Sequence, residues 1–128
     1  MADNLHVELV AADRVVWSGE ATLVIARTTD GEVGVLKNHA PMLAVLVPSP
    51  VEVVTIEDER WYAVVDGGFL SVANNRVSII SEYAQLSGEI DLEAARRDLE
   101  RARQSDTPES EEEIRLAETR IRVGERAR

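Results

Sequence analysis

The sequence predicts a β plus α fold, in which a flattened antiparallel β-sandwich is followed by a C-terminal antiparallel helical hairpin. Up to residue 86, short segments rich in Val, Ile and Leu alternate with turn residues about every 8–12 positions, which is typical of a sandwich or barrel. From residue 87 the chain consists mainly of Ala, Leu, Ile, Glu and Arg, which favour helix. We therefore divide the chain into a β-sandwich domain, residues 1–86, and a helical hairpin, residues 87–128.

Several strands are expected in order along the first domain. Leu5, Val7 and Leu9 occupy every second position, as in a strand with one buried face. Asn74 and Asn75 suit a two-residue hairpin turn, because Asn tolerates positive φ. The expected strands cover residues 5–10, 15–17, 21–28, 32–36, 42–47, 51–56, 60–65, 68–73 and 76–81.

Two interruptions separate apolar runs in this domain. Pro48 and Pro50 should end the strand over residues 42–47, because proline cannot donate a hydrogen bond to a sheet. Residues 66–68 contain two glycines and should form a turn, with Phe69 in the core directly after it.

Two helices are expected in the hairpin. Asp91 is a good N-cap for the first, which should end near Gln104. Thr107 and Pro108 should begin the second, because Pro is favoured in a first turn. Apolar stripes support both helices: Leu92, Ala95, Leu99 and Ala102 on the first, and Ile114, Ala117 and Ile121 on the second, with Leu116 and Val123 to one side. Expected ion pairs between residues four apart are Glu93–Arg97, Glu111–Arg115 and Glu118–Arg122.

The apolar stripes of the hairpin are thin and rich in alanine. Burying one Leu or Ile contributes roughly 1.5–3 kcal/mol, whereas ordering the chain costs about 1.5 kcal/mol for each residue. We therefore expect the hairpin to need a surface on which to dock, which would be the sandwich, a ligand or a partner protein.

Composition excludes several function classes. The net charge of −10 disfavours nucleic acid and anionic lipid as partners, because both attract basic surfaces. The chain has no Cys, so disulfides and thiolate sites are excluded. No signal peptide is expected, and no apolar run approaches the ~20 residues of a membrane-spanning helix. We expect no metal, no nucleic acid and no direct insertion into a membrane.

Few residues suit catalysis. His6 falls on an expected strand and His39 on a loop, with no nucleophile-elbow pattern and too few ligands for zinc. One alternative is a small hydrolase that uses His39 with an acid such as Asp66. Another is a free-standing nucleotide-sensing domain, in which arginines of the hairpin converge on a phosphate.

Four segments, in order along the chain, resemble the family of epsilon subunits of the bacterial F-type ATP synthase, called delta in mitochondria. They are Gly31-Glu-Val-Gly-Val-Leu36 with His39 and Pro41, Val65-Asp-Gly-Gly-Phe-Leu70, Arg76-Val-Ser-Ile-Ile80, and Ile90-Asp91 at the start of the hairpin. The resemblance implies a flattened sandwich of about ten strands plus the hairpin, and no active site of its own.

The resemblance also implies partners. The sandwich of such a subunit binds the gamma subunit and rests on the ring of c subunits, forming the central-stalk rotor that couples proton flow to ATP synthesis. The hairpin either folds down on the sandwich or extends to the alpha and beta subunits of the catalytic head, where it inhibits ATP hydrolysis. The location implied is the cytoplasmic face of the cell membrane, through the complex. By match, Glu32, Lys37, His39 and Pro41 are assigned to the end of the sandwich that faces the c ring.

Some members of this family bind ATP in the folded-down hairpin, and here their motif is incomplete. The matching residues are Ile90, Asp91, Ala95, Arg101 and Arg120. Ala94 and Leu116 stand where arginines belong, and Gln85 stands where a glutamate belongs. Because alanine offers no donor to a phosphate group, we expect ATP binding to be weak or absent, and we expect no other cofactor.

Overall fold

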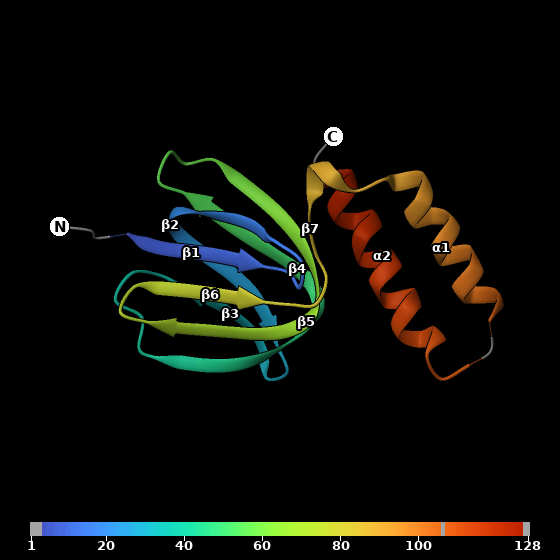
Figure 1. Cartoon of the computed structure of the whole chain (residues 1–128), viewed down its shortest axis with the longest axis horizontal. Coiled ribbons are helices and arrows are strands. Elements are labelled where there is room, and N and C mark those ends of the chain that lie inside the picture. The colour runs from blue at the N-terminus through green and yellow to red at the C-terminus, as the bar shows by residue number, and fades with distance from the viewer. Residues whose placement is uncertain (1–3, 106, 127–128) are drawn as a thin grey trace.

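The computed structural model describes residues 4–105 and 107–126, and it contains the β-sandwich and the helical hairpin that the sequence predicts. The two helices stand against one end of the sandwich, and β1 begins at the opposite end (Figure 1). The elements are β1 (Leu5–Val10), β2 (Val15–Thr28), β3 (Gly31–Val35), β4 (Met42–Thr55), β5 (Arg60–Ala73), β6 (Arg76–Ile80), β7 (Ala84–Leu86), the 3-10 turn η1 (Ser87–Glu89), α1 (Leu92–Gln104) and α2 (Ser110–Arg126).

The sheet closes on itself. Its strands pair in the order β1-β6-β5-β4-β2-β3, and β1 also pairs with β2, while β7 pairs with β5. Pairing is antiparallel throughout the described strands except between β1 and β6, which run parallel. Asn74 and Asn75 join β5 to β6 with φ angles of 51° and 62°, which confirms the predicted two-residue turn. Closure satisfies the backbone of the ring of strands without help from the helices.

Seven strands form the sandwich in the described residues, where the resemblance implied about ten. The difference arises because β2, β4 and β5 are each 14 residues long and each joins two segments that the sequence analysis separated. Pro48 and Pro50 lie inside β4, paired with β5. They are tolerated because the pairing of β4 with β2 shifts register between Ile25 and Thr28, so β2 requires no hydrogen bond from them.

At its midpoint β5 bends without ending, which corrects the turn expected there. Gly67 and Gly68 have φ angles of 81° and 110°, a region open to glycine. A Cβ atom on Gly68 would lie 2.0 Å from the carbonyl oxygen of Ile80. Beyond this bend Leu70 faces the core, and Phe69, which was expected in the core, is 52% exposed.

The sandwich core is built from its own strands. β1 buries Leu5, Val7 and Leu9 on one face, as the alternation predicted. The remaining strands contribute mainly Val, and Trp17 and Trp61 pack at the edge with ring centroids 4.8 Å apart. In the part of the chain that the structure describes, no helical side chain belongs to this core.

α1 begins and ends as expected. Asp91 caps it, because its Oδ1 accepts a hydrogen bond from the backbone N–H of Ala94 at 3.1 Å, and the helix ends at Gln104. α2 begins later than expected, at Ser110. Both the backbone N–H and the Oγ of Ser110 donate to the carbonyl oxygen of Thr107, at 3.1 and 2.6 Å, so a turn precedes the helix.

α2 lies between the sandwich and α1 (Figure 1), so two of its faces are covered. Gly124 is buried against Leu92, the first residue of α1. Val123, which was expected to one side of the main stripe, is almost fully buried, whereas Ile114 and Ile121 of that stripe are only half-buried. A single apolar stripe suits a helix with one packing partner, whereas α2 packs against both the sandwich and α1.

Candidate functional site

The contact between the hairpin and the sandwich is the first candidate site. Val64 of β5, Ile90 before α1, and Val123 of α2 form a cluster whose members are at most 1% exposed. Tyr62, Tyr83 and Leu116 pack around it, half-buried. We call this set of six residues the docking cluster. The guanidinium carbon of Arg126 lies 5.0 Å from the centroid of the Tyr62 ring, which adds a cation–π contact at its edge.

The segment that joins the two domains is fixed by Glu89. Its Oε1 accepts hydrogen bonds from the Arg14 guanidinium at 3.1 Å and from the backbone N–H of Leu86 at 3.0 Å. The hydrogen bond from Arg14 and, to a smaller extent, the one from Leu86 hold the pKa of the Glu89 carboxyl below its ordinary value. Gln85 donates to the backbone oxygen of Glu89 at 2.9 Å. The base of the hairpin is therefore tied to the turn between β1 and β2.

Arg120 connects α2 to α1 and to the sandwich. Its Nη1 donates to Oδ2 of Asp98 at 3.0 Å, and its side chain is 15% exposed. Asp98 also lies 3.5 Å from the guanidinium of Arg101. Burial raises the pKa of the Tyr83 hydroxyl, while Arg120, close to it, acts in the opposite direction. Tyr83 itself donates to Gln85, so a polar chain runs from α1 to β7.

The structure brings together some of the residues matched to the ATP motif. Arg101 and Arg120 line one cavity of about 460 Å³ between the helices, and Asp98 lies between them. The other three matched residues have local roles: Ile90 is buried in the docking cluster, Asp91 caps α1, and Ala95 is fully buried.

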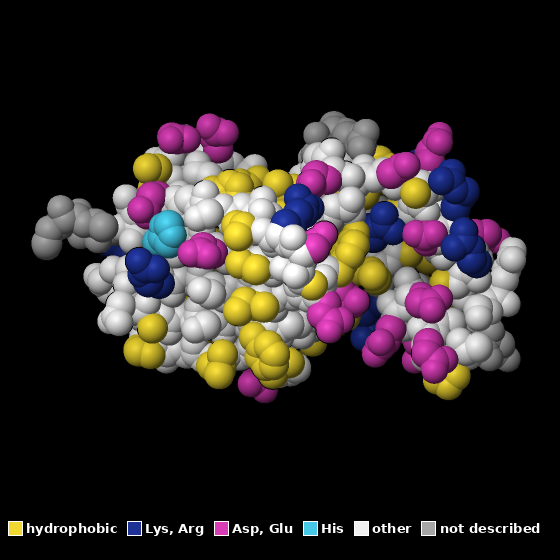
Figure 2. Space-filling view, in the orientation of Figure 1, with side chains coloured by type: hydrophobic (Ala, Val, Ile, Leu, Met, Phe, Trp, Pro, Cys, Tyr) yellow, Lys and Arg dark blue, Asp and Glu magenta, His cyan; other side chains and the backbone are white. Residues whose placement is uncertain are grey.

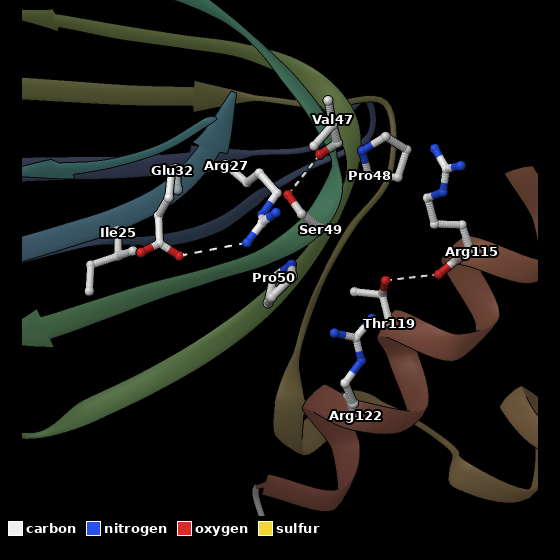
Figure 3. A pocket seen from close by; sticks show the side chains of 11 residues that line it. Ile25, Arg27, Glu32, Val47, Pro48, Ser49, Pro50, Arg115, Thr119 and Arg122 are labelled. Atoms are coloured by element: carbon white, nitrogen blue, oxygen red, sulfur yellow. Dashed lines mark hydrogen bonds and ion pairs between the residues drawn. The ribbon is translucent and has the colours of Figure 1, made fainter. Parts of the chain in front are cut away.

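A second cavity, of about 430 Å³, lies between α2 and the strands β2, β3 and β4 (Figure 3). Its charged lining consists of Arg27, Glu32, Arg115 and Arg122. Thr119, which is 2% exposed, donates its hydroxyl to the carbonyl oxygen of Arg115 at 2.8 Å. Arginines of the sandwich and of the hairpin therefore share one space.

Sequence reasoning missed this cavity because it assigned its arginines to neighbours on the same helix. Within the described residues, Arg115 and Arg122 form no ion pair with Glu111 or Glu118. Glu118 instead lies 3.8 Å from Arg103 of α1. The expected pair between residues 93 and 97 is also not formed. A signal was present: Arg115 and Arg122 are seven residues apart, two helical turns, and thus lie on one face.

The four residues assigned to the ring-facing end lie at two ends of the sandwich. Glu32 is on β3, 4.0 Å from Arg27, and lines the cavity beside α2. Lys37, His39 and Pro41 lie in the loop after β3, near the β5–β6 turn, where the N–H of Asn38 donates to Oδ1 of Asn75 at 2.6 Å. Most of β3 lies between the two groups, so they belong to different parts of the sandwich surface. That either end faces a ring stays a prediction.

An exposed apolar surface lies on the outside of the sandwich. Val45, Phe69 and Ile80 are neighbours across β4, β5 and β6, and they are 48%, 52% and 52% exposed. Leu43, two residues before Val45 on the same face, is 74% exposed. Hydrophobic side chains gather on the visible face of the sandwich in Figure 2, whereas the hairpin shows mostly acidic and basic ones. Such a contiguous patch is typical of a protein–protein contact.

The residues of the hydrolase alternative are not brought together. His39 is in the loop far from the helices, whereas Asp66 is paired with Pro48 at the end of the sandwich that faces α2. His6 is on the surface of the sheet, 3.8 Å from both Glu8 and Glu20. Among the described residues there is no group of three or more possible metal ligands, and no helix is long and apolar enough to cross a membrane.

Comparison with known proteins identifies relatives of the whole chain. The family described as ATP synthase, Delta/Epsilon chain, beta-sandwich domain, matches residues 4–87. The ATP synthase epsilon chain of Streptomyces avermitilis is 52% identical over 96% of this chain and 97% of its own length, and that of Rhodococcus jostii is 48% identical over 97% and 98%. Among solved structures, a chain of the Euglena gracilis mitochondrial ATP synthase, in an OSCP/F1/c-ring assembly, is similar with a TM-score of 0.74 and 26% identity, over 98% of this chain and 79% of that one.

Proposed function

The chain belongs to the ATP synthase delta/epsilon family, and on this premise we propose that it is a non-catalytic rotor subunit of the central stalk, which couples proton flow to ATP synthesis. Its place is the cytoplasmic face of the cell membrane, where the complex holds it. The observation that supports this most strongly is that epsilon chains match the sandwich and the hairpin together, over 96% of the chain.

The partner of the exposed apolar surface is the gamma subunit. Leu43, Val45, Phe69 and Ile80 expose large side chains that a soluble surface would rarely gather in one place. Phe69→Asp should prevent the chain from co-purifying with gamma, because it places a charge in the middle of a desolvated contact. Val15→Asp, at another exposed apolar position, 58% exposed, should leave co-purification unchanged. Equal loss in both variants would contradict this assignment.

The contact with the c ring uses only one end of the sandwich. Single-cysteine variants Glu32→Cys and His39→Cys carry a cross-linker at one end each, in a chain with no other cysteine. We expect one of the two to react with a c subunit in the assembled complex. Reaction at both positions, or at neither, would contradict a flat contact at one end.

The hairpin is the regulatory arm. In its docked position three fully buried apolar side chains hold it, each worth roughly 1.5–3 kcal/mol before the entropy of ordering is subtracted. Docking is thus weak enough for a second docking place, on the alpha and beta subunits of the head, to compete. Released and wholly helical, residues 87–128 would reach roughly 60 Å. In that position the arm inhibits ATP hydrolysis.

We expect no tight ATP binding at Arg101 and Arg120, in the cavity between α1 and α2. Asp98 lies beside both Arg101 and Arg120, where a phosphate group would have to bind, and its carboxylate repels one. Ala94 supplies no replacement donor. Isolated protein titrated with ATP should therefore bind it weakly or not at all at these two arginines, and micromolar affinity lost on Arg101→Gln would contradict the proposal.

The decisive experiment compares ATP hydrolysis by the parent complex carrying the full chain with hydrolysis by the complex carrying a chain that ends at Leu86. We expect faster hydrolysis without the arm, with proton-coupled synthesis retained. Co-purification of the shortened chain with gamma is the control for assembly. Unchanged hydrolysis would refute the inhibitory role and leave the coupling role in place.

A further inference from the structure

The cavity between α2 and the sandwich is lined by more basic than acidic side chains, although the molecule as a whole is acidic. The chain carries a net charge of −10, yet Arg27, Arg115 and Arg122 line this space with Glu32 as the only acidic side chain among the described lining residues. In Figure 3, Arg27 extends from β2 and Arg122 from α2 toward the same space, and Arg115 lies beside Pro48. A volume of about 430 Å³ is in the range of small-molecule sites.

The arginines of this cavity have few internal partners. Arg115 and Arg122 form no ion pair within the described residues, although glutamates stand four residues before each of them. Within the described residues Arg27 pairs only with Glu32, at a long distance of 4.0 Å. The three guanidinium groups line one space with a single described carboxylate, Glu32, so they repel one another in part. An anion that binds among them removes this repulsion.

We propose that Arg27, Arg115 and Arg122 form a binding site for a small phosphate-type dianion at the junction of the sandwich and the hairpin. Guanidinium groups suit phosphate, because their planar donors match its oxygens in pairs. The hydroxyls of Ser49 and Thr119, both 2% exposed, already donate to backbone carbonyls, so recognition depends on the arginines. This site is separate from the cavity between α1 and α2, where Asp98 occupies the arginines.

A ligand at this site connects two domains. Arg27 belongs to β2 of the sandwich, whereas Arg115 and Arg122 belong to α2 of the hairpin. Any molecule that binds only when both are in place stabilises the docked hairpin by mass action. This consequence rests on the proposed regulatory arm. Since ATP synthesis consumes phosphate, the arm would then be docked when this substrate is abundant.

The test measures binding of inorganic phosphate to the full isolated chain by calorimetry at low ionic strength, where exposed charges are least screened. We expect saturable binding that is about tenfold weaker in R122Q and in R27Q, the loss of one charged hydrogen bond. R97Q is the matched control, because Arg97 is an exposed arginine of α1 outside the cavity, and it should bind phosphate normally. Circular dichroism checks that each variant is folded.

Several outcomes would overturn the site. They are the absence of saturable phosphate binding to the unaltered chain, an equal loss in R97Q and R122Q, or no loss in R122Q and R27Q. ATP is the second probe: if it competes with phosphate and is weakened by the same variants, a nucleotide is the source of the phosphate group; if it does not compete, the ligand is free phosphate. Both results retain the site.

Hydrogen exchange tests the regulatory consequence separately. Phosphate should slow exchange of α2 amides in the unaltered chain and not in R122Q. Binding without this protection would refute the link to the arm and leave the site. All of these measurements use the isolated chain, so their failure is distinct from that of the rotor role, which is tested in the complex.

Discussion

The sandwich and the hairpin are stabilised in different ways. The sandwich is a closed ring of paired strands around a core that it supplies itself, mostly Val. The hairpin has short apolar stripes, and its helices are joined by ion pairs and small residues. Among the described residues, three ion pairs connect α1 to α2: Arg96–Glu125, Arg103–Glu118 and Arg120–Asp98. The pairs Arg96–Glu125 and Arg103–Glu118 are exposed, and exposed pairs contribute at most about 1 kcal/mol each.

This difference teaches where each domain is vulnerable. In the sandwich, one bad contact disturbs a core in which every strand depends on its neighbours. In the hairpin, the same kind of change disturbs only the docking cluster or one ion pair, and the arm can leave while the sandwich stays folded. An arm that regulates by moving needs this separation of stabilities. Matched changes in the two domains test this separation.

The largest effect is expected from Gly68→Ala in β5. The φ of 110° is strained for alanine, and its Cβ would lie 2.0 Å from the backbone oxygen of Ile80, which cannot move without breaking the pairing of β5 with β6. We expect a loss of about 4 kcal/mol or more in the free energy of unfolding. Urea denaturation followed by tryptophan fluorescence measures it, because Trp17 and Trp61 pack against the core.

The matched change in the hairpin is Gly124→Ala. Its Cβ would lie 2.7 Å from Cδ2 of Leu92, the flexible end of a side chain that can turn away. Alanine also favours helix over glycine by about 0.8–1.0 kcal/mol. We expect the unfolding midpoint of the sandwich to stay within error of the unaltered chain. If both glycine variants lost comparable stability, the two domains would not be separable.

Local sequence patterns predicted several features of both domains. The alternation in β1, the Asn74–Asn75 turn and the Asp91 cap each depend on neighbouring residues, and all three were confirmed. What the sequence did not predict depends on residues far apart. Phe69 is exposed beyond the bend at Gly68, where the backbone of Ile80 leaves no room for a side chain.

The candidate sites were predicted less completely for the same reason. Arg115 has a suitable glutamate one helical turn away, and a pattern of charges cannot tell that it lines a cavity together with Arg27 across the domain junction. Likewise, Glu32 and His39 are close in sequence, and only the length of β3 separates them in space. Arg101 and Arg120, both matched to the motif, line one cavity, and the match did not predict that Asp98 would lie beside both of them.

The next-largest effect is expected from a change in the docking cluster. Val123→Asp would bury a carboxylate against Val64 and Ile90 with no cationic partner in the cluster, at a cost of about 3 kcal/mol. The buried charge weakens docking, so the hairpin should be released more often and cut faster in limited proteolysis, while the unfolding midpoint of the sandwich is retained.

The control for release is Val15→Asp, an equal change at a position 58% exposed on the sandwich. Its hairpin should resist proteolysis as in the unaltered chain. If Val123→Asp also lowered the stability of the sandwich core, the hairpin would be part of the folding unit, contrary to the comparison.

A smaller effect is expected from Asp98→Asn. The carboxylate is 44% exposed, so its loss should cost only about 0.5–1 kcal/mol of hairpin stability, seen as faster hydrogen exchange in α1. Because Arg101 and Arg120 would lose their shared partner, ATP affinity should rise. Glu100→Gln, a neutralisation elsewhere on α1 at an exposed residue, is the control and should not change ATP affinity. Unchanged affinity in Asp98→Asn would mean that its carboxylate does not exclude ATP.

The smallest effect is a pH dependence at the base of the hairpin. The pKa of Glu89 is lowered in the folded state by the hydrogen bond from Arg14, so its contribution is present above its ordinary value of 4.5 and is lost as pH falls through the lowered folded value. Since the pair is exposed, the change should be below about 1 kcal/mol.

The difference between the unaltered chain and Glu89→Gln isolates the contribution of Glu89 from that of other carboxylates. Amide exchange at residues 85–89 should differ between the two at pH 7 and converge in acid. A difference that persists at low pH would mean that the shape of the side chain, rather than its charge, fixes this segment. The hairpin would then be tied to the sandwich more firmly than separate stabilities of the two domains allow.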